Sequence, residues 1–262
     1  MSPTPPGPTP DPMPVRREAF KPIAIRAPGE NRALFALRCV ADLQLLTTYR
    51  FLRRELARCR GDVLDVGAGQ SPWRELLQSC RYTGLDVDSA EAFGMRRMPD
   101  IVYYDGGAMP LPDGSFDHVL CAEVLEHVPD EHLLLAEIAR VLRPGGTLVL
   151  TLPWSARLHH LPHDYRRLTA AGLERLIARH GLQVQHLEPR GNDLAVIANK
   201  LIVVLIRLLR PQPWWQAWWC WPLALPAALA AVLFLIAAHA SMALGRGSAD
   251  DPLGYALVAV RR

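Results

Sequence analysis

The sequence has very little lysine and no cysteine pattern of the kind that disulfide frameworks or zinc sites require. Lys21 and Lys200 are the only lysines among 29 basic residues, and the formal net charge at pH 7 is +3. No basic run or stripe points to a nucleic acid as partner. The five cysteines are odd in number, widely spaced and contain no Cys-x-x-Cys pair, which indicates a reducing, cytosolic compartment.

The amino-terminal region lacks the apolar run of a signal peptide. Seven prolines stand among residues 1–14, and we expect residues 1–30 to form a disordered tail, because such a segment buries little apolar surface. In residues 31–60, leucines recur at helical spacing and predict one or two amphipathic helices. We interpret the arginines between them as the solvated face of these helices.

Short apolar runs alternate with helical patterns over the next part of the chain. Strands are predicted over residues 62–66, 82–87, 101–104, 116–122, 147–152 and 182–187. Helices are predicted over residues 72–80, 89–95, 130–142 and 169–180. Strands separated by crossover helices form a parallel, doubly wound α/β sheet, so this is the predicted fold class.

The turn after the first strand carries the sharpest chemical signal. Residues 63–73, VLDVGAGQSPW, predict a strand, a glycine turn and a helix that starts at Pro72. Two glycines let a ligand approach the backbone, and a helix N-terminus favours an electron-rich group. Asp86 ends the second strand 21 residues after Asp65, where a carboxylate can accept hydrogen bonds from both ribose hydroxyls. The combined spacing predicts a nucleoside ligand.

The same segment argues against a nicotinamide cofactor. The third glycine of a dinucleotide Gly-x-Gly-x-x-Gly motif falls on Pro72, which would disturb the approach of a pyrophosphate to the helix. Neither lysine has a tyrosine four residues before it, so the Tyr-x-x-x-Lys pair of a short-chain reductase is absent from the sequence.

Five blocks of the chain resemble the class I S-adenosylmethionine-dependent methyltransferases and, within them, the type 11 methyltransferase domain. These blocks are residues 63–69, 84–88, 104–117, 119–128 and 137–153. The resemblance implies a Rossmann-like, seven-stranded, mostly parallel sheet whose last strand is antiparallel. Residues 254–260 have the pattern for that strand, so residues 61–190 and 250–262 are assigned to one methyltransferase domain.

The resemblance also implies a site for S-adenosylmethionine. Its residues in this chain are Asp65, Gly67, Gly69, Asp86, Asp105 and Gly106. Asp65 would orient the amino group of the cofactor through the turn, and Gly67 and Gly69 would cradle its methionine part. The second aspartate would hold the ribose. Asp105 would accept a hydrogen bond from the adenine amino group, beside the backbone of Gly106. Ser71 stands where many members carry a further glycine, which leaves the shape of the carboxylate end open.

The loop LHHLPHDYRRLT, residues 158–169, follows the predicted fifth strand at the edge where open α/β sheets bind ligands. Methyl transfer needs an aligned nucleophile and removal of its proton. We predict His163, with His160 as an alternative, as the general base, Asp164 as the group that orients the imidazole and Arg166 as a clamp for an anionic acceptor. In the alternative interpretation, Asp164, Tyr165 and Arg166 only fix this loop to the sheet.

A second cluster of polar residues, Glu123, Glu126 and His127, stands near the start of a predicted helix. A similar Glu-x-x-Glu-His block holds a divalent cation in some methyltransferases, whereas many metal-free type 11 members share it. We therefore expect a capping and packing role and no metal.

Residues 191–249 form an apolar insertion before the last predicted strand. Residues 194–209 are apolar apart from one asparagine and two cations, and five of the seven tryptophans lie within residues 214–221. Residues 222–244 then run for 23 positions without a charged side chain, about 35 Å as a helix, which is long enough to span a bilayer. Tryptophans are typical of the membrane interface.

The insertion must return to the side from which it left, because the strands before and after it pair in one sheet. An interfacial helix followed by a re-entrant segment satisfies this, and so does a two-helix hairpin. We expect residues 194–244 to contact a membrane; the alternatives are a helical lid and a dimerisation arm.

The predicted function is methyl transfer from S-adenosylmethionine to an oxygen or nitrogen, with carbon as the less favoured alternative, of a small-molecule or lipid-linked acceptor. The acceptor classes are an amphiphilic small molecule, a lipid-linked glycan and a quinone-type precursor, and the predicted location is the cytoplasmic side of the inner membrane. A nucleic-acid methyltransferase is disfavoured, because residues 121–124 read CAEV where a base-binding Pro-Pro block would stand. A non-catalytic module that retains the cofactor fold is the other alternative.

Overall fold

The computed structural model describes residues 22–262, so most of the predicted tail lies outside the described residues. The remainder of that segment is attached to the domain. The amide of Gly29 donates to the carboxylate of Glu75 at 2.8 Å, and Arg38 donates to the carbonyls of Ile23 and Ala24. Residues 22–30 therefore belong to the domain surface, and the predicted boundary at residue 30 is too late.

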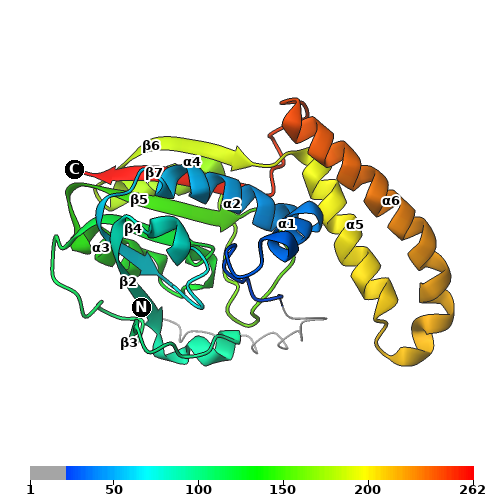
Figure 1. Cartoon of the computed structure of the whole chain (residues 1–262), viewed down its shortest axis with the longest axis horizontal. Coiled ribbons are helices and arrows are strands. Elements are labelled where there is room, and N and C mark those ends of the chain that lie inside the picture. Colours follow the sequence, from blue (N-terminus) through cyan, green and yellow to red (C-terminus); the bar gives the residue numbers. More distant parts are fainter. Residues whose placement is uncertain (1–21) are drawn as a thin grey trace, which may run out of the picture.

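A seven-stranded sheet forms the centre of the molecule, with the order β3-β2-β1-β4-β5-β7-β6 (Figure 1). Its strands are β1 (Gly61–Val66), β2 (Cys80–Val87), β3 (Ile101–Tyr104), β4 (Phe116–Ala122), β5 (Leu142–Pro153), β6 (Leu182–Arg190) and β7 (Gly254–Arg261). Strand β7 runs antiparallel between β5 and β6, and the pairs among β1 to β5 are parallel. The predicted fold class is confirmed.

Helices cover both faces of the sheet. They are α1 (Arg32–Ala41), α2 (Leu43–Leu56), α3 (Glu131–Val141), α4 (Ala170–Arg179), α5 (Asp193–Leu209) and α6 (Ala217–Ala243). Helices α3 and α4 bury their apolar side chains on one face, with Ile138 and Ile177 fully buried. Helices α1 and α2 and the first turns of α5 pack on the other face, where Leu43 and Ala195 are fully buried.

Polar side chains fix where these helices begin. Asp42 ends α1 and caps α2, since its own amide bonds to Arg38 and its carboxylate accepts from the amide of Leu45. Asp130 and Thr169 cap α3 and α4 in the same way. Each cap satisfies an amide that the helix leaves unpaired.

Two helices predicted beside the sheet are short 3₁₀ segments instead. They are η1 (Arg74–Leu77) in place of residues 72–80 and η2 (Asp88–Phe93) in place of residues 89–95. The first lies in the short segment between the glycine turn and Cys80, where β2 begins. The second ends at Gly94, whose left-handed backbone stops the helix.

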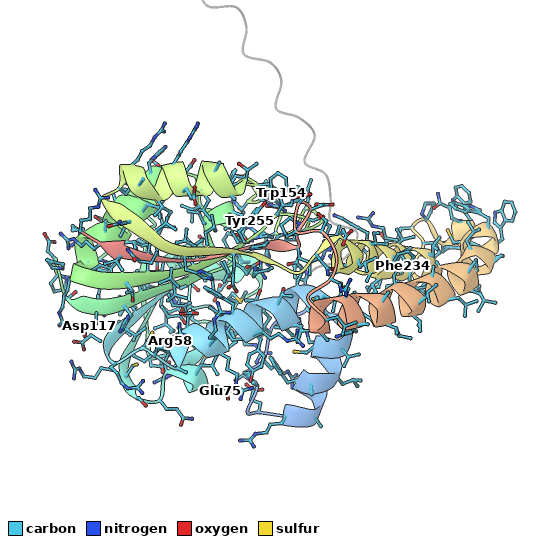
Figure 2. All side chains as sticks on the ribbon, turned by 90° about the horizontal axis from the view of Figure 1, so that it is seen from above. Arg58, Glu75, Asp117, Trp154, Phe234 and Tyr255 are labelled. Carbon is cyan, nitrogen blue, oxygen red and sulfur yellow. The ribbon has the colours of Figure 1, made fainter. Side chains whose placement is uncertain are left out.

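Helices α5 and α6, joined through η4 (Trp214–Gln216), form a hairpin that projects from the domain (Figures 1 and 2). Asn192 holds its base by accepting from the amide of Ala195 and donating to the hydroxyl of Ser241 at 2.9 Å. Of the forms left open by the sequence, the chain adopts the two-helix hairpin. Residues Trp214–Ala243 are long and apolar enough to cross a membrane, and only 17% of their most apolar window is buried.

Candidate functional site

The glycine turn after β1 is fastened to the end of β2. The amides of Gly67 and Ala68 both donate to the carbonyl of Leu85, at 2.8 and 3.0 Å. Gly67 has a φ of +68°, and a Cβ atom there would lie 2.4 Å from the side chain of Val124. This position therefore requires glycine.

Two buried carboxylates flank this turn. Asp86 accepts from the amide of Gly69 at 2.8 Å and from that of Val87 at 2.7 Å. Burial raises its pKa. Asp65 accepts from the hydroxyl of Tyr82 at 2.8 Å, and burial raises the pKa of Asp65 to about 7. A carboxylate has about four acceptor sites, so Asp86 keeps room for two hydroxyl donors.

Asp105 and Gly106 follow β3 at the same edge of the sheet. Asp86 pairs with Tyr103, and β3 ends one residue before Asp105, so Asp105 follows the strand that neighbours the end of β2. Gly106 has a φ of +88°, and the exposed Asp105 carboxylate accepts from the amide of Gly107. The six predicted cofactor residues thus lie along the carboxyl ends of β1, β2 and β3, and the acceptor oxygens of the aspartates suit the hydroxyl and amino groups of a nucleoside.

Histidines gather where the loop after β5 crosses η3 (Leu125–His127). The ring of Phe93, in η2, lies 5.2 Å from the ring of His163, 5.7 Å from that of His160 and 6.1 Å from that of His127, between centroids. Phe93 stands seven residues after Asp86. The segment η2, which follows β2, thus contributes an aromatic ring to the histidine cluster, a role for Phe93 that no sequence signal suggested.

Asp164, which was predicted to orient the imidazole of the general base, lies against a third histidine of the loop. Its carboxylate contacts His159, at 3.0 Å from the amide and 3.3 Å from Nδ1, and not the imidazole of His163. Arg167 donates to both of its oxygens. Although burial opposes ionisation, these hydrogen bonds hold the pKa of Asp164 well below its usual range. His163 instead places Nδ1 3.0 Å from the hydroxyl of Tyr165.

The acceptor-binding role predicted for Arg166 also needs correction. Its guanidinium donates to the carbonyls of Leu125, Val128 and Pro129 and forms an ion pair with Glu131 at 2.7 Å. These contacts match the alternative interpretation, in which Arg166 fixes the loop to η3 and the start of α3.

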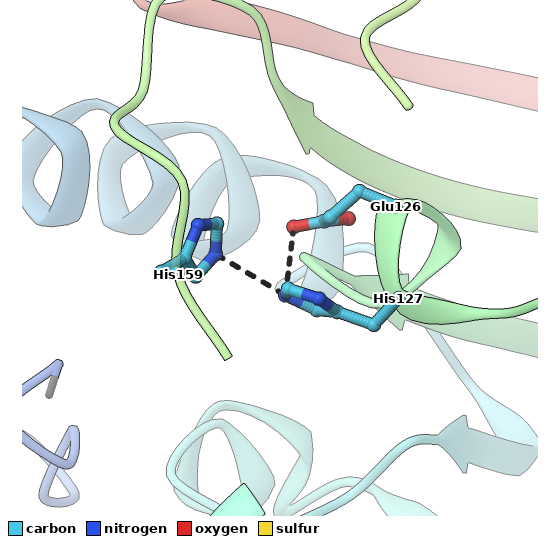
Figure 3. A group of neighbouring side chains, drawn as sticks. All are labelled: Glu126, His127 and His159. Carbon is cyan, nitrogen blue, oxygen red and sulfur yellow. Dashed lines mark hydrogen bonds and ion pairs between the residues drawn. The ribbon is translucent and has the colours of Figure 1, made fainter. Parts of the chain in front are cut away.

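Glu123, Glu126 and His127 do not act as one group. Glu123 forms an ion pair with Arg190 at 2.8 Å. Glu126 is fully buried, and neither of its carboxylate oxygens has a hydrogen-bond partner within residues 22–262. Burial raises its pKa well above the usual value. It lies beside His127 and His159 (Figure 3).

The family profile for a methyltransferase domain matches residues 64–150, the segment that holds the glycine turn, Asp86, Asp105 and His127. Over these residues the chain is similar to the class I S-adenosylmethionine-dependent methyltransferases. The cofactor of the family is S-adenosylmethionine, which agrees with the nucleoside site described above.

Two relatives of this methyltransferase illustrate the range of the family. A fatty-acid O-methyltransferase of Mycolicibacterium smegmatis is 36% identical over 157 residues, which cover 55% of this chain and 56% of that protein. A ubiquinone biosynthesis O-methyltransferase of Xanthomonas oryzae is 34% identical over 135 residues, or 48% and 54% of the two chains. The matched region thus spans little more than half the length of these relatives.

A solved structure from Galdieria sulphuraria, a candidate sarcosine dimethylglycine methyltransferase, has the same fold. It is 18% identical, with a TM-score of 0.50 over 83% of this chain and 86% of that chain. At this identity the likeness concerns the fold alone.

Proposed function

We propose that this methyltransferase transfers a methyl group to an oxygen or nitrogen of an amphiphilic acceptor at the cytoplasmic surface of a membrane. The observation that carries the proposal is the position of the histidine cluster. Phe93, in the segment η2 that follows β2, packs against His163, and the histidine loop and the predicted cofactor residues both follow the carboxyl ends of parallel strands, which supports a proton acceptor at the same edge of the sheet.

The residues at this edge have two separate roles, cofactor binding and proton transfer. Gly67, Gly69 and Asp86 would hold the turn against the cofactor, and Asp105 would accept from its adenine. When bound, S-adenosylmethionine supplies an activated methyl group on a sulfonium. The protein then has to align the acceptor and take its proton, and we assign proton removal to His163.

The amphiphilic nature of the acceptor is inferred from the hairpin. Leu225, Leu229 and Leu233 of α6 are between 65% and 68% exposed, and the apolar side chains point in all directions around this helix. Soluble proteins rarely expose apolar patches of more than a few hundred Å². A lipid bilayer would cover this surface, and a lipid-soluble acceptor could then reach the enzyme without leaving the membrane.

Charge and aromatic side chains at the hairpin support lipid over a protein partner. Residues 194–249 contain four cations and no acidic residue, which suits anionic head groups. The tryptophans of residues 214–221 stand at the tip, and Trp214 and Trp218 are 84% and 75% exposed. Such side chains favour the membrane interface.

The proposed activity is tested with the purified full chain, S-adenosylmethionine labelled at the methyl group, and membrane and soluble extracts of the source organism. Mass spectrometry should find the label in a lipid-soluble product. The Asp86→Ala variant should lose most of this labelling. Label in nucleic acid, or only in water-soluble products, would contradict the proposed acceptor class. Cofactor binding without any transfer would favour the non-catalytic module.

The role of His163 is tested by His163→Ala. Turnover should fall by about a hundredfold or more, while the affinity for S-adenosylhomocysteine stays within about twofold. Tyr165→Phe is the matched control, because it removes the hydroxyl next to His163 and keeps both rings. Full activity in His163→Ala would leave the loop with a structural role only.

A further inference from the structure

Three ligand-type side chains converge at the carboxyl ends of β4 and β5. Glu126 and His127 come from η3, and His159 comes from the loop after β5 (Figure 3). Nε2 of His127 lies 3.1 Å from Nε2 of His159 and 3.6 Å from Oε1 of Glu126. One ligand atom from each residue lies within 4.8 Å of the other two.

The hydrogen bonds behind the two imidazoles determine which nitrogen carries the proton. Nδ1 of His127 lies 2.6 Å from the carbonyl oxygen of His163, so Nδ1 must be the donor. Nδ1 of His159 lies 3.1 Å from the carbonyl of Arg157 and 3.3 Å from Asp164, and it must also donate. Nε2 is therefore the nitrogen that each ring has available to bind a metal ion, and the two Nε2 atoms face each other at 3.1 Å.

The carboxylate of Glu126 adds two buried acceptor oxygens to this arrangement. The side chain is fully buried, and both oxygens lack a hydrogen-bond partner among the described residues. A buried carboxylate without a partner is strongly disfavoured. A single cation between the three side chains would bind both Nε2 atoms and one oxygen of the carboxylate.

We propose that Glu126, His127 and His159 bind a divalent transition-metal ion. Two imidazoles and one carboxylate are the ligands that Zn²⁺, Mn²⁺ and Fe²⁺ prefer, whereas Mg²⁺ favours oxygen ligands. The carbonyl and carboxylate behind the two histidines are the outer partners that orient metal-bound imidazoles. Glu123 is not part of the site, because Arg190 engages it.

The sequence alone gave no sign that His159 belongs with Glu126 and His127. His127 and His159 are 32 residues apart, and only the crossing of the loop over η3 brings them together. An ion at this place could lower the pKa of an acceptor hydroxyl. That role rests on the proposed function, whereas the existence of the site does not.

The test uses the full chain in detergent micelles, freed of metal with a chelator. Co²⁺ is the spectroscopic probe, because its visible absorption reports the ligands, and Zn²⁺ is titrated by calorimetry. Both ions should saturate at one equivalent per chain, and the ion should raise the melting temperature.

Two variants test the ligands, and a third is the control. His159→Gln should weaken Zn²⁺ binding at least about tenfold. Glu126→Gln should also weaken Zn²⁺ binding at least about tenfold, because a neutral amide oxygen is a poorer metal ligand than a carboxylate. His180→Gln is the matched control. It alters a second histidine pair, His132 and His180 at 3.0 Å, which has no buried carboxylate, so Zn²⁺ binding should be unchanged.

Several results would overturn the metal site. They are a wild-type chain that binds neither ion, a His159→Gln variant that binds as tightly as the wild type, and a loss of binding in His180→Gln. A proton shared between the two Nε2 atoms, detected by NMR and unaffected by Zn²⁺, would also replace the ion. Binding of S-adenosylhomocysteine, measured on the same samples, separates failure of the metal site from failure of the cofactor assignment.

Discussion

The sheet and the α5–α6 hairpin differ in how far their leucines are exposed. Leu64, Leu120 and Leu150 in the sheet are fully buried between helices on both faces. Leu225 and Leu229 in α6 are 68% and 66% exposed, although the segment is more apolar than any other helix of the described chain. The domain covers its own apolar surface, whereas the hairpin depends on a cover that the chain does not supply.

The base of the hairpin packs into the core of the domain. Ala195, Ala198 and Ala238 are fully buried in the core that also holds α1 and α2. Removing the whole insertion would therefore open the domain. A test of the membrane contact should change only the distal part.

The largest effect is expected from charges on the exposed face of α6. Leu229→Asp combined with Leu233→Asp should move the chain from membranes to the soluble fraction, since an acidic residue in the bilayer centre costs about 2.5–3.5 kcal/mol. Vesicle flotation measures the shift. Leu133→Asp is the control, because Leu133 is an exposed leucine of α3 in the catalytic domain, 40% exposed. Equal flotation of the double variant and the wild type would show that lipid is not the cover.

The second effect concerns the core. Leu120→Ala should lower the free energy of unfolding by about 2–5 kcal/mol, because it leaves a cavity in a packed interior. Leu225→Ala should change it by about 0.5 kcal/mol or less. Thermal melts in mild detergent, followed by circular dichroism, compare the two. A large loss in Leu225→Ala would mean that a protein surface packs against the hairpin.

The third effect is confined to the cofactor edge. Asp86→Ala should weaken binding of S-adenosylhomocysteine by about ten- to a hundredfold, or about 1.5–3 kcal/mol, because two ribose hydroxyls lose their acceptor. Calorimetry gives the affinity. Asp88→Ala, two residues later, is the control, since its carboxylate is exposed and faces Arg97. Unchanged affinity in Asp86→Ala would contradict the ribose assignment.

The smallest effect is expected where the two regions join. Asn192→Ala removes the cap of α5 and should lower the free energy of unfolding by about 1 kcal/mol. Asn192→Asp keeps a capping oxygen but loses the donor to Ser241, so a melt between those of the wild type and the alanine variant is expected. If both variants melt like the wild type, Asn192 does not hold the base of the hairpin.

Local patterns in the sequence were sufficient for the sheet and for the cofactor edge. Alternating apolar runs predict strands because each strand must bury its side chains on a period of two, and the observed bounds of β3 and β4 agree with the prediction. The glycines at 67 and 69 and the aspartate at 86 could be located because turn geometry and strand ends restrict which residues fit.

Only the tertiary structure decided the arrangement of the histidine loop. Asp164 was expected beside His163 and lies against His159, and Arg166 was expected to face the acceptor and instead binds three carbonyls. Such partners depend on how a loop folds back over another segment, which no periodicity encodes. The meeting of Glu126 with His159 has the same cause.

The sequence by itself determined that this chain forms a methyltransferase domain with a nucleoside site and an apolar insertion. These properties follow from short-range constraints: hydrophobic periodicity, glycine in left-handed turns, and the lack of charge over residues 222–244. The tertiary structure decided that the insertion is a hairpin rooted in the core, and which side chains meet above β4 and β5. Those contacts join residues far apart in the chain, so they exist only when loop closure and packing bring them together.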